Sequence, residues 1–108
     1  MVFAVLLTRH AARDLEELYD YVARRDAPGK AEHVLGRLEK AFGGLSESPQ
    51  RGACPRELLA MGNREYREVF FKPYRIIYKV VGTNVYVLLI ADGRRDLQTL
   101  LQRRLLEG

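Results

Sequence analysis

The chain has 108 residues, and its 18 lysines and arginines against 14 aspartates and glutamates give a net charge of +4. This length predicts one domain over residues 1–108, and 47% apolar with 30% charged residues is typical of a folded globular protein rather than a disordered or membrane-spanning one. One cysteine, Cys54, excludes an internal disulfide, and with only two histidines it excludes a structural zinc site. The reducing cytoplasm is the expected compartment.

The positive charge is concentrated in the C-terminal part of the sequence. Residues 1–63 contain nine basic and nine acidic side chains, whereas residues 64–108 contain nine basic and five acidic ones. Such an asymmetry suggests an acidic partner, either a nucleic acid or an acidic protein segment. The alternative is a surface that arginine keeps soluble, and the charge by itself favours this alternative because the excess is small.

The first elements are predicted to be a strand and a helix. Residues 2–7 are apolar on both alternating faces, which favours a strand buried on both sides over an exposed edge strand. Thr8 is a suitable N-cap for a helix over residues 9–25. The helix follows from a stripe of apolar residues at helical spacing: Ala11, Leu15, Leu18 and Val22.

A second helix is predicted over residues 28–42, with Asp26 as its cap and Pro28 in its first turn. Gly43-Gly44 is expected to end it. The short joint between the two helices predicts an antiparallel helical hairpin. Residues 46–55 are predicted to be a loop, and residues 56–62 fit either a short extended piece or a helical turn.

Three strands and a helix are predicted to follow. The strands cover residues 65–71, 74–81 and 85–91, separated by turns at Lys72-Pro73 and residues 82–84. The third is almost continuously apolar and is expected at the centre of the sheet. A short terminal helix, capped by Asp96, begins at Leu97, and its leucines are expected to pack on the sheet.

These elements predict an α+β fold. It consists of an N-terminal strand, an antiparallel helical hairpin on one face of the sheet, and a three-stranded antiparallel meander that completes a four-stranded sheet. A short C-terminal helix ends the chain.

Common catalytic patterns are missing from the sequence. His10 and His33 lie in different helices with no carboxylate pattern linked to either, and Cys54 lies in a loop without an associated histidine. No glycine pattern suits a phosphate-binding loop, and no carboxylate cluster suits a metal. We therefore expect neither a cofactor nor a metal.

Arginine is the remaining candidate for chemistry. Arg67 and Arg75 lie on strands that flank the Lys72-Pro73 turn, and Arg94 and Arg95 follow the last strand. If neighbouring strands pair, these guanidinium groups are expected to converge on one surface that can bind phosphate. The alternative is a solvated face whose arginines pair with Glu65, Glu68 and Asp96, which is favoured for Arg67 and about equally weighted for Arg75. The strand tyrosines are candidates for base stacking, but core packing is favoured for all of them: Tyr66, Tyr74, Tyr78 and Tyr86.

Three segments together resemble the RelE/ParE superfamily of toxins from type II toxin–antitoxin modules. They are LTRHAARDLEELYDYV, REYREVFFKPYRIIYKV and VYVLLIADGRRDLQTLLQRRL, and they cover nearly the whole chain in order. The resemblance implies a cognate antitoxin, with an acidic or amphipathic segment that folds over the sheet and helices on binding. RelE-like members cleave messenger RNA on the ribosome, whereas ParE-like members poison DNA gyrase.

By this resemblance, Arg67, Arg75 and Arg95 match the basic positions of the RelE-like catalytic site. A second basic position on the same strand as Arg67 is replaced by Val69, and the terminal tyrosine position by Leu101. Both departures weaken the nuclease interpretation, because RNA cleavage requires groups that move protons.

Other relatives carry a histidine where this chain has Asp92, for which a turn or capping role is favoured over that of a base. The favoured hypothesis is therefore a ParE-like inhibitor of DNA gyrase that contacts its target through Arg94, Arg95, Arg103 and Arg104. The alternatives are a ribosome-dependent mRNA endonuclease that uses Arg67, Arg75 and Arg95, or an inactive toxin-fold protein that only binds its antitoxin.

Overall fold

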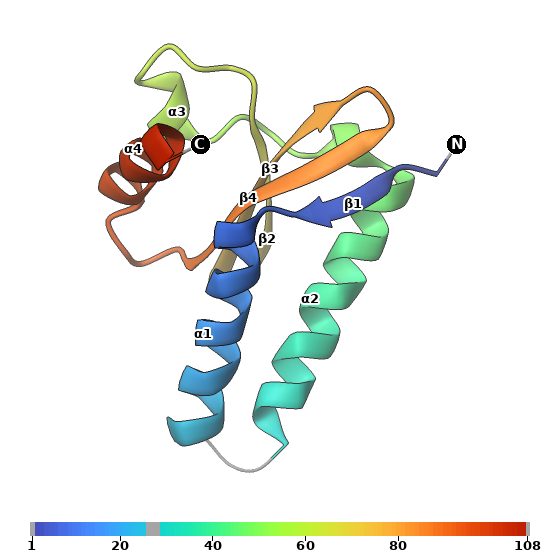
Figure 1. Ribbon diagram of the computed structural model, residues 1–108, viewed down its shortest axis with the longest axis vertical. Coiled ribbons are helices and arrows are strands. Elements are labelled where there is room, and N and C mark those ends of the chain that lie inside the picture. The colour runs from blue at the N-terminus through green and yellow to red at the C-terminus, as the bar shows by residue number, and fades with distance from the viewer. Residues whose placement is uncertain (1, 26–28, 108) are drawn as a thin grey trace.

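The computed structural model describes residues 2–25 and 29–107 and has the predicted α+β architecture (Figure 1). The elements in chain order are β1 (Ala4–Leu7), α1 (Arg9–Arg25), α2 (Lys30–Glu47), the short 3₁₀ helix η1 (Pro49–Arg51), α3 (Arg56–Leu59), β2 (Arg67–Phe71), β3 (Tyr74–Val81), β4 (Asn84–Asp92) and α4 (Leu97–Glu107). The sheet order is β1-β4-β3-β2. β1 runs parallel to β4, and the other neighbours are antiparallel, so β4 lies inside the sheet as predicted.

One face of the sheet is covered by the helical hairpin of α1 and α2, whose antiparallel helices are seen in Figure 1. The core between them contains the fully buried side chains of Leu38 and Leu45 from α2 and of Ile76 and Tyr78 from β3. α1 has the predicted bounds because its apolar stripe faces this core. The Thr8 hydroxyl accepts a hydrogen bond from the Ala11 amide at 3.2 Å, which confirms the predicted cap.

The opposite face is covered at one end by α3 and α4, which lie together on the far side of the sheet from the hairpin (Figure 1). Leu97 and Leu101 of α4 are buried there with Ile77 and Leu89 of the sheet, which confirms the predicted packing of the terminal helix. The Asp96 carboxylate accepts the Thr99 amide at 3.2 Å and so caps α4 as expected.

The prediction that the first strand is buried on both faces was wrong. β1 is an edge strand that pairs only with β4, and Leu6 is 43% exposed. The reason is that α3 and α4 cover the other end of the sheet and leave this face of β1 open.

The predicted end of the second helix was also wrong. α2 continues through Gly43 and Gly44 to Glu47 because tertiary contacts stabilise its last turn. Leu45 is fully buried, and Ser46 exchanges backbone and side-chain hydrogen bonds with Phe3. The predicted cap at Asp26 and first-turn Pro28 lie outside the described residues.

Smaller differences occur elsewhere. The predicted loop over residues 46–55 contains the last residues of α2 and the short helix η1, and residues 56–59 form α3. β3 has the predicted bounds, β2 starts two residues later than predicted, and β4 is one residue longer at each end. Within the described ranges, no helix is both long and apolar enough to cross a membrane.

Candidate functional site

Arg75 of β3 is buried, with 6% of its surface exposed, and its guanidinium group binds two carboxylates. Nη1 and Nη2 donate to the two carboxylate oxygens of Glu57 in α3, at 2.7 and 2.8 Å. Nε donates to Glu68 Oε1 at 2.7 Å, and Nη2 forms an ion pair with the same oxygen at 2.6 Å. The hydrogen bond from Arg75 lowers the pKa of Glu57, and the same bond raises the pKa of Arg75, so both groups stay charged. The guanidinium group inside this apolar strand is therefore paired with one carboxylate from α3 and one from β2.

Arg75 also supports the turn that follows β4. The Gly93 amide donates to the Pro73 carbonyl at 2.8 Å, and a Cβ at Gly93 would lie 3.1 Å from Arg75 Cδ. A side chain at this position would press on the arginine stem, which would have to shift by a few tenths of an ångström to admit it.

Arg67 of β2 lies on the other face of the sheet from Arg75. Its cross-strand partner is Tyr78, which packs against the helical hairpin, whereas the cross-strand partner of Arg75 is Ala91 in the core under α3 and α4. Cross-strand partners share a face, so the two arginines point to opposite sides. The structure does not bring them together, contrary to the expected convergence.

The Arg67 side chain holds the segment that precedes α3. Nη1 donates to the carbonyl oxygens of Gln50 and Gly52, at 3.1 and 2.7 Å. The buried Tyr78 hydroxyl donates to Pro49 O at 2.7 Å and accepts the Gly52 amide at 3.2 Å. Burial raises the pKa of Tyr78, which keeps the hydroxyl protonated as a donor.

Arg104 of α4 is likewise engaged inside the protein. Its Nη1 and Nη2 donate to the two carboxylate oxygens of Asp14 in α1, at 2.8 and 3.0 Å, and Nη1 also donates to Leu88 O at 2.8 Å. Only 11% of the Arg104 side chain is exposed. Little of the Arg104 side chain is therefore available for the direct target contact predicted from the sequence.

The turn after β4 carries the exposed arginines. It borders a groove of about 520 Å³ between α1 and the end of β4, with Arg94 and Arg95 on its rim and Tyr21 and Tyr74 among its aromatic walls. The Arg94 side chain is 81% exposed and forms an ion pair of 2.6 Å with Asp92.

Asp92 acts in the turn rather than as a base. Its Oδ1 accepts the Arg94 amide at 2.9 Å, which is the turn role favoured from the sequence. The hydrogen bond from the Arg94 side chain lowers the pKa of Asp92, and a carboxylate with a lowered pKa is a weaker base.

Arg103 on α4 is exposed, and its side chain forms no hydrogen bond or ion pair with the other described residues. Arg94, Arg95 and Arg103 are thus the candidate arginines that face solvent, whereas Arg67, Arg75 and Arg104 are bound internally. The charged surface that remains is the turn after β4 and the outer side of α4.

Two positions that the resemblance assigns to a RelE-like site carry apolar residues. Val69 and Leu101, at the positions of a second basic residue and a tyrosine, are both buried in the core. His10 lies 3.8 Å from Glu107 at the other end of α1 from the groove rim at Tyr21, and His33 is exposed on α2. Among the described residues, no group of three or more histidine, cysteine or carboxylate side chains could hold a metal ion.

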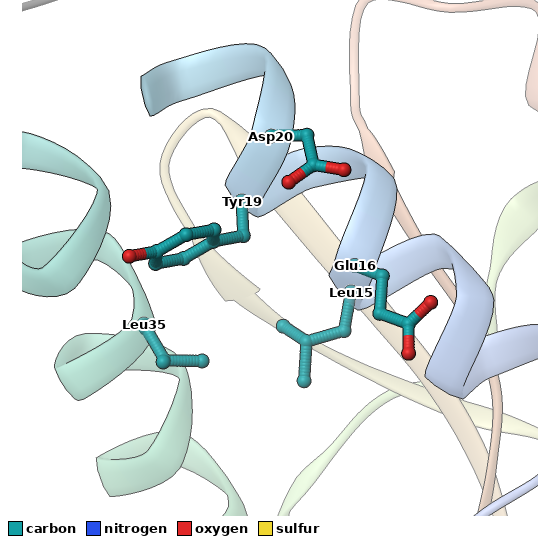
Figure 2. Close-up of a pocket in the computed structure, with 5 residues that line it drawn as sticks. All are labelled: Leu15, Glu16, Tyr19, Asp20 and Leu35. Carbon is teal, nitrogen blue, oxygen red and sulfur yellow. The ribbon is translucent and has the colours of Figure 1, made fainter. Parts of the chain in front are cut away.

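Two of the strand tyrosines and the groove between α1 and α2 add no phosphate site. Tyr66 and Tyr78 are buried, so neither offers a free face for a base. A second groove of about 440 Å³ lies between α1 and α2, where Leu15, Leu35 and the Tyr19 ring face a common space beside Glu16 and Asp20 (Figure 2). Its charged side chains are acidic, so it would repel a phosphate.

Several residues of this arrangement were not predicted to act together. Glu68 was expected as an ion-pair partner of the arginine face, but Glu57 lay in a segment of uncertain structure. Asp14 lies off the predicted apolar stripe of α1, and nothing in the sequence around it marks it as a partner for an arginine. Its partner is 90 residues away in sequence, so no local pattern could have indicated it.

Comparison with known proteins gives consistent matches. Residues 5–97 match the family described as ParE toxin of type II toxin–antitoxin system, parDE. Toxin ParE3 of Caulobacter vibrioides is 31% identical over 100 residues, covering 93% of this chain and 96% of the relative, and Toxin RelE1 of the same organism is 33% identical over 94 residues, covering 86% and 96%. A solved structure described as a chromosomal ParDE toxin–antitoxin system from P. aeruginosa superimposes with a TM-score of 0.69 at 22% identity, covering 84% of this chain and 96% of that one.

Proposed function

Because this chain belongs to the ParE toxin family of type II toxin–antitoxin systems, we propose that it inhibits DNA gyrase and is neutralised by a cognate antitoxin. The observation that carries the choice of target is the state of Arg75. Its Nε–H, both N–H groups of Nη2 and one N–H of Nη1 are directed at Glu57 and Glu68, so one N–H of Nη1 remains, whereas a bidentate hydrogen bond with a scissile phosphate needs two.

The other nuclease positions support the same choice. Arg67 donates to two backbone carbonyls, and Val69 and Leu101 are apolar and buried. RNA cleavage must deprotonate a hydroxyl and protonate a leaving oxygen, and the two carboxylates that contact Arg75, those of Glu57 and Glu68, are both held in ion pairs with it. A toxin that acts by binding requires neither step.

The exposed arginines supply the binding surface. Arg95 and Arg103 can each form bidentate hydrogen bonds with a carboxylate or a phosphate, and Arg94 can do so by exchanging its exposed ion pair with Asp92 for one with the target. We place the gyrase contact on this surface, which consists of the turn over residues 92–96 and the outer side of α4.

The open face of the sheet and the cations beside it suit an antitoxin segment that is acidic or amphipathic. The sheet face beyond α4 stays open, with Leu6 and Val81 exposed at 43% and 50%, and Lys79 lies beside them in a groove of about 350 Å³. Apolar contacts on the open sheet and ion pairs with the cations would hold such a segment.

A RelE-like activity is the second candidate, favoured by one observation. The match to Toxin RelE1 is as high in identity as the match to Toxin ParE3, and Arg95 is exposed at the position of a RelE-like arginine. An inactive protein that only binds its antitoxin is the third. Absence of growth arrest on expression would favour it over both toxins.

Inhibition of gyrase supercoiling by the purified chain tests the proposal. We expect inhibition by the wild-type chain and loss of inhibition when Arg94, Arg95 and Arg103 are all replaced by alanine. The matched control replaces three exposed cations of the helical hairpin, Arg13, Arg24 and Lys40, and so removes the same charge.

The control should inhibit like the wild type. No inhibition by the wild-type chain at large molar excess would refute gyrase as the target. Equal loss of inhibition in the triple variant and in the control would mean that only the net charge of the protein matters, and that the gyrase contact is not on the turn and α4.

A further inference from the structure

We propose that Asp14 is a positioning residue, whose carboxylate holds the turn over residues 92–96 and the helix α4 in a fixed relation. In doing so it sets the arrangement of Arg94, Arg95 and Arg103. The inference rests on the proposed function, because it assigns Asp14 a part in presenting the gyrase-binding surface.

The first observation is that β4 extends further than its neighbour β1. β1 pairs with residues 84–87 of β4, but β4 continues to Asp92. Beyond the pairing, two side chains occupy the open edge of β4. The Ile90 amide donates to Asp14 Oδ2 at 3.1 Å, and the Leu88 carbonyl accepts Arg104 Nη1 at 2.8 Å.

The second observation is that these two side chains bind each other. Arg104 donates to both oxygens of Asp14, at 2.8 and 3.0 Å, and the side chains are only 11% and 15% exposed. A bidentate arginine–carboxylate pair fixes orientation as well as distance. α4 is therefore held in one rotation against α1 and β4.

The third observation is the place of the Asp14 bonds along the chain. Ile90 comes just before the turn, and Arg104 lies in the helix just after it, so one carboxylate binds the elements on both sides of Arg94 and Arg95. Asp14 also lines the same groove as Arg94 and Arg95.

The turn has internal bonds that do a different job. The Asp92 side chain and carbonyl accept the amides of Arg94 and Arg95, at 2.9 and 3.1 Å, and these bonds fix the shape of the turn. They do not fix where the turn sits on the molecule. The hydrogen bond from the Gly93 amide to the Pro73 carbonyl ties the turn to the sheet, and its placement relative to α1 and α4 is the role assigned to Asp14.

Asp14→Asn tests the inference, because asparagine keeps the size of the side chain but loses the charge and one acceptor. We expect faster hydrogen exchange of the amides in residues 92–96 and α4. The concentration needed for half-inhibition of gyrase should rise about tenfold, since a hydrogen bond to a charged group has roughly that effect or more on an equilibrium. In an Arg95→Ala background the same substitution should have a much smaller effect.

Tyr78→Phe is the control, because it removes buried hydrogen bonds on the opposite face of the sheet, next to Pro49 and Gly52. It should lower stability without changing exchange in the turn or inhibition by the folded protein. Unchanged exchange of the turn in Asp14→Asn would overturn the inference. So would an equal loss of inhibition with and without Arg95, or an equal loss in the control.

Failure of the proposed function gives a different result. If the wild-type chain does not inhibit gyrase, the target is wrong. The exchange measurement needs no target and still decides whether Asp14 holds the turn and α4.

Discussion

Replacement of Arg75 by methionine should destabilise the protein strongly. The substitution keeps an unbranched stem under Gly93 but leaves Glu57 and Glu68 without their partner, although their side chains are only 14% and 9% exposed. Breaking a buried ion pair by removing one partner costs about 3–5 kcal/mol, a large part of the roughly 5–15 kcal/mol that a typical domain has.

Urea denaturation at pH 7 measures this loss. With a slope of about 2 kcal/mol per molar urea, the midpoint should fall by roughly 2 M. Arg94→Met is the matched control, because it removes an arginine from an ion pair whose side chain is 81% exposed, and its midpoint should hardly move. A variant that also replaces Glu57 and Glu68 by leucine should regain most of the loss, since buried ion pairs can be exchanged for apolar groups at little cost.

The destabilisation should depend on pH with a definite sign. Arg75 lowers the pKa of Glu57 in the folded state, so the wild type has this stabilisation above the unfolded pKa and loses it as pH falls through the folded pKa. The difference between wild type and Arg75→Met should therefore be largest near pH 7 and shrink below about pH 4. A small difference in stability between wild type and Arg75→Met at pH 7, or one that grows in acid, would refute the view that Arg75 is held in the structure by two carboxylates.

Two further predictions concern the glycines and the helical hairpin. Gly52→Ala should destabilise by about 1–3 kcal/mol in urea, because its Cβ would lie 2.5 Å from the Tyr78 hydroxyl, whereas Gly36→Ala, in open space on α2, should stabilise by about 0.5–1 kcal/mol. The same sign for both would contradict the packing described. Tyr19 donates a hydrogen bond of 2.6 Å to Glu32, which raises the pKa of Tyr19, so Glu32→Gln should lower that pKa in an ultraviolet titration; an unchanged titration would mean that the bond does not form in solution.

The parts of the fold with strong periodicity were predictable from the sequence. The apolar stripe of α1 and the alternation in β3 gave the observed bounds, because burial on one face selects these patterns. The end of α2 was not predictable, since Leu45 and Ser46 hold the last turn through contacts with the core and with Phe3. Local glycine preference was weaker than those contacts.

The candidate site was less predictable, because side-chain direction depends on register and on distant elements. Arg67 and Arg75 flank one turn, yet the register places them on opposite faces. Which carboxylate binds which arginine depends on where α1 and α3 lie. Arg75 binds Glu57 of α3, 18 residues away in sequence, and Arg104 binds Asp14 of α1, 90 residues away. Sequence could nominate the arginines but could not say which of them are internally bound.

The central claim is that Arg75 is neutralised inside the protein and leaves this toxin fold without an RNA-cleaving site. Primer extension on ribosome-bound transcripts incubated with the wild-type chain tests it most directly. We predict a full-length product with no codon-linked cuts. Cuts that appear with the wild-type chain and disappear with Arg75→Lys would contradict the claim.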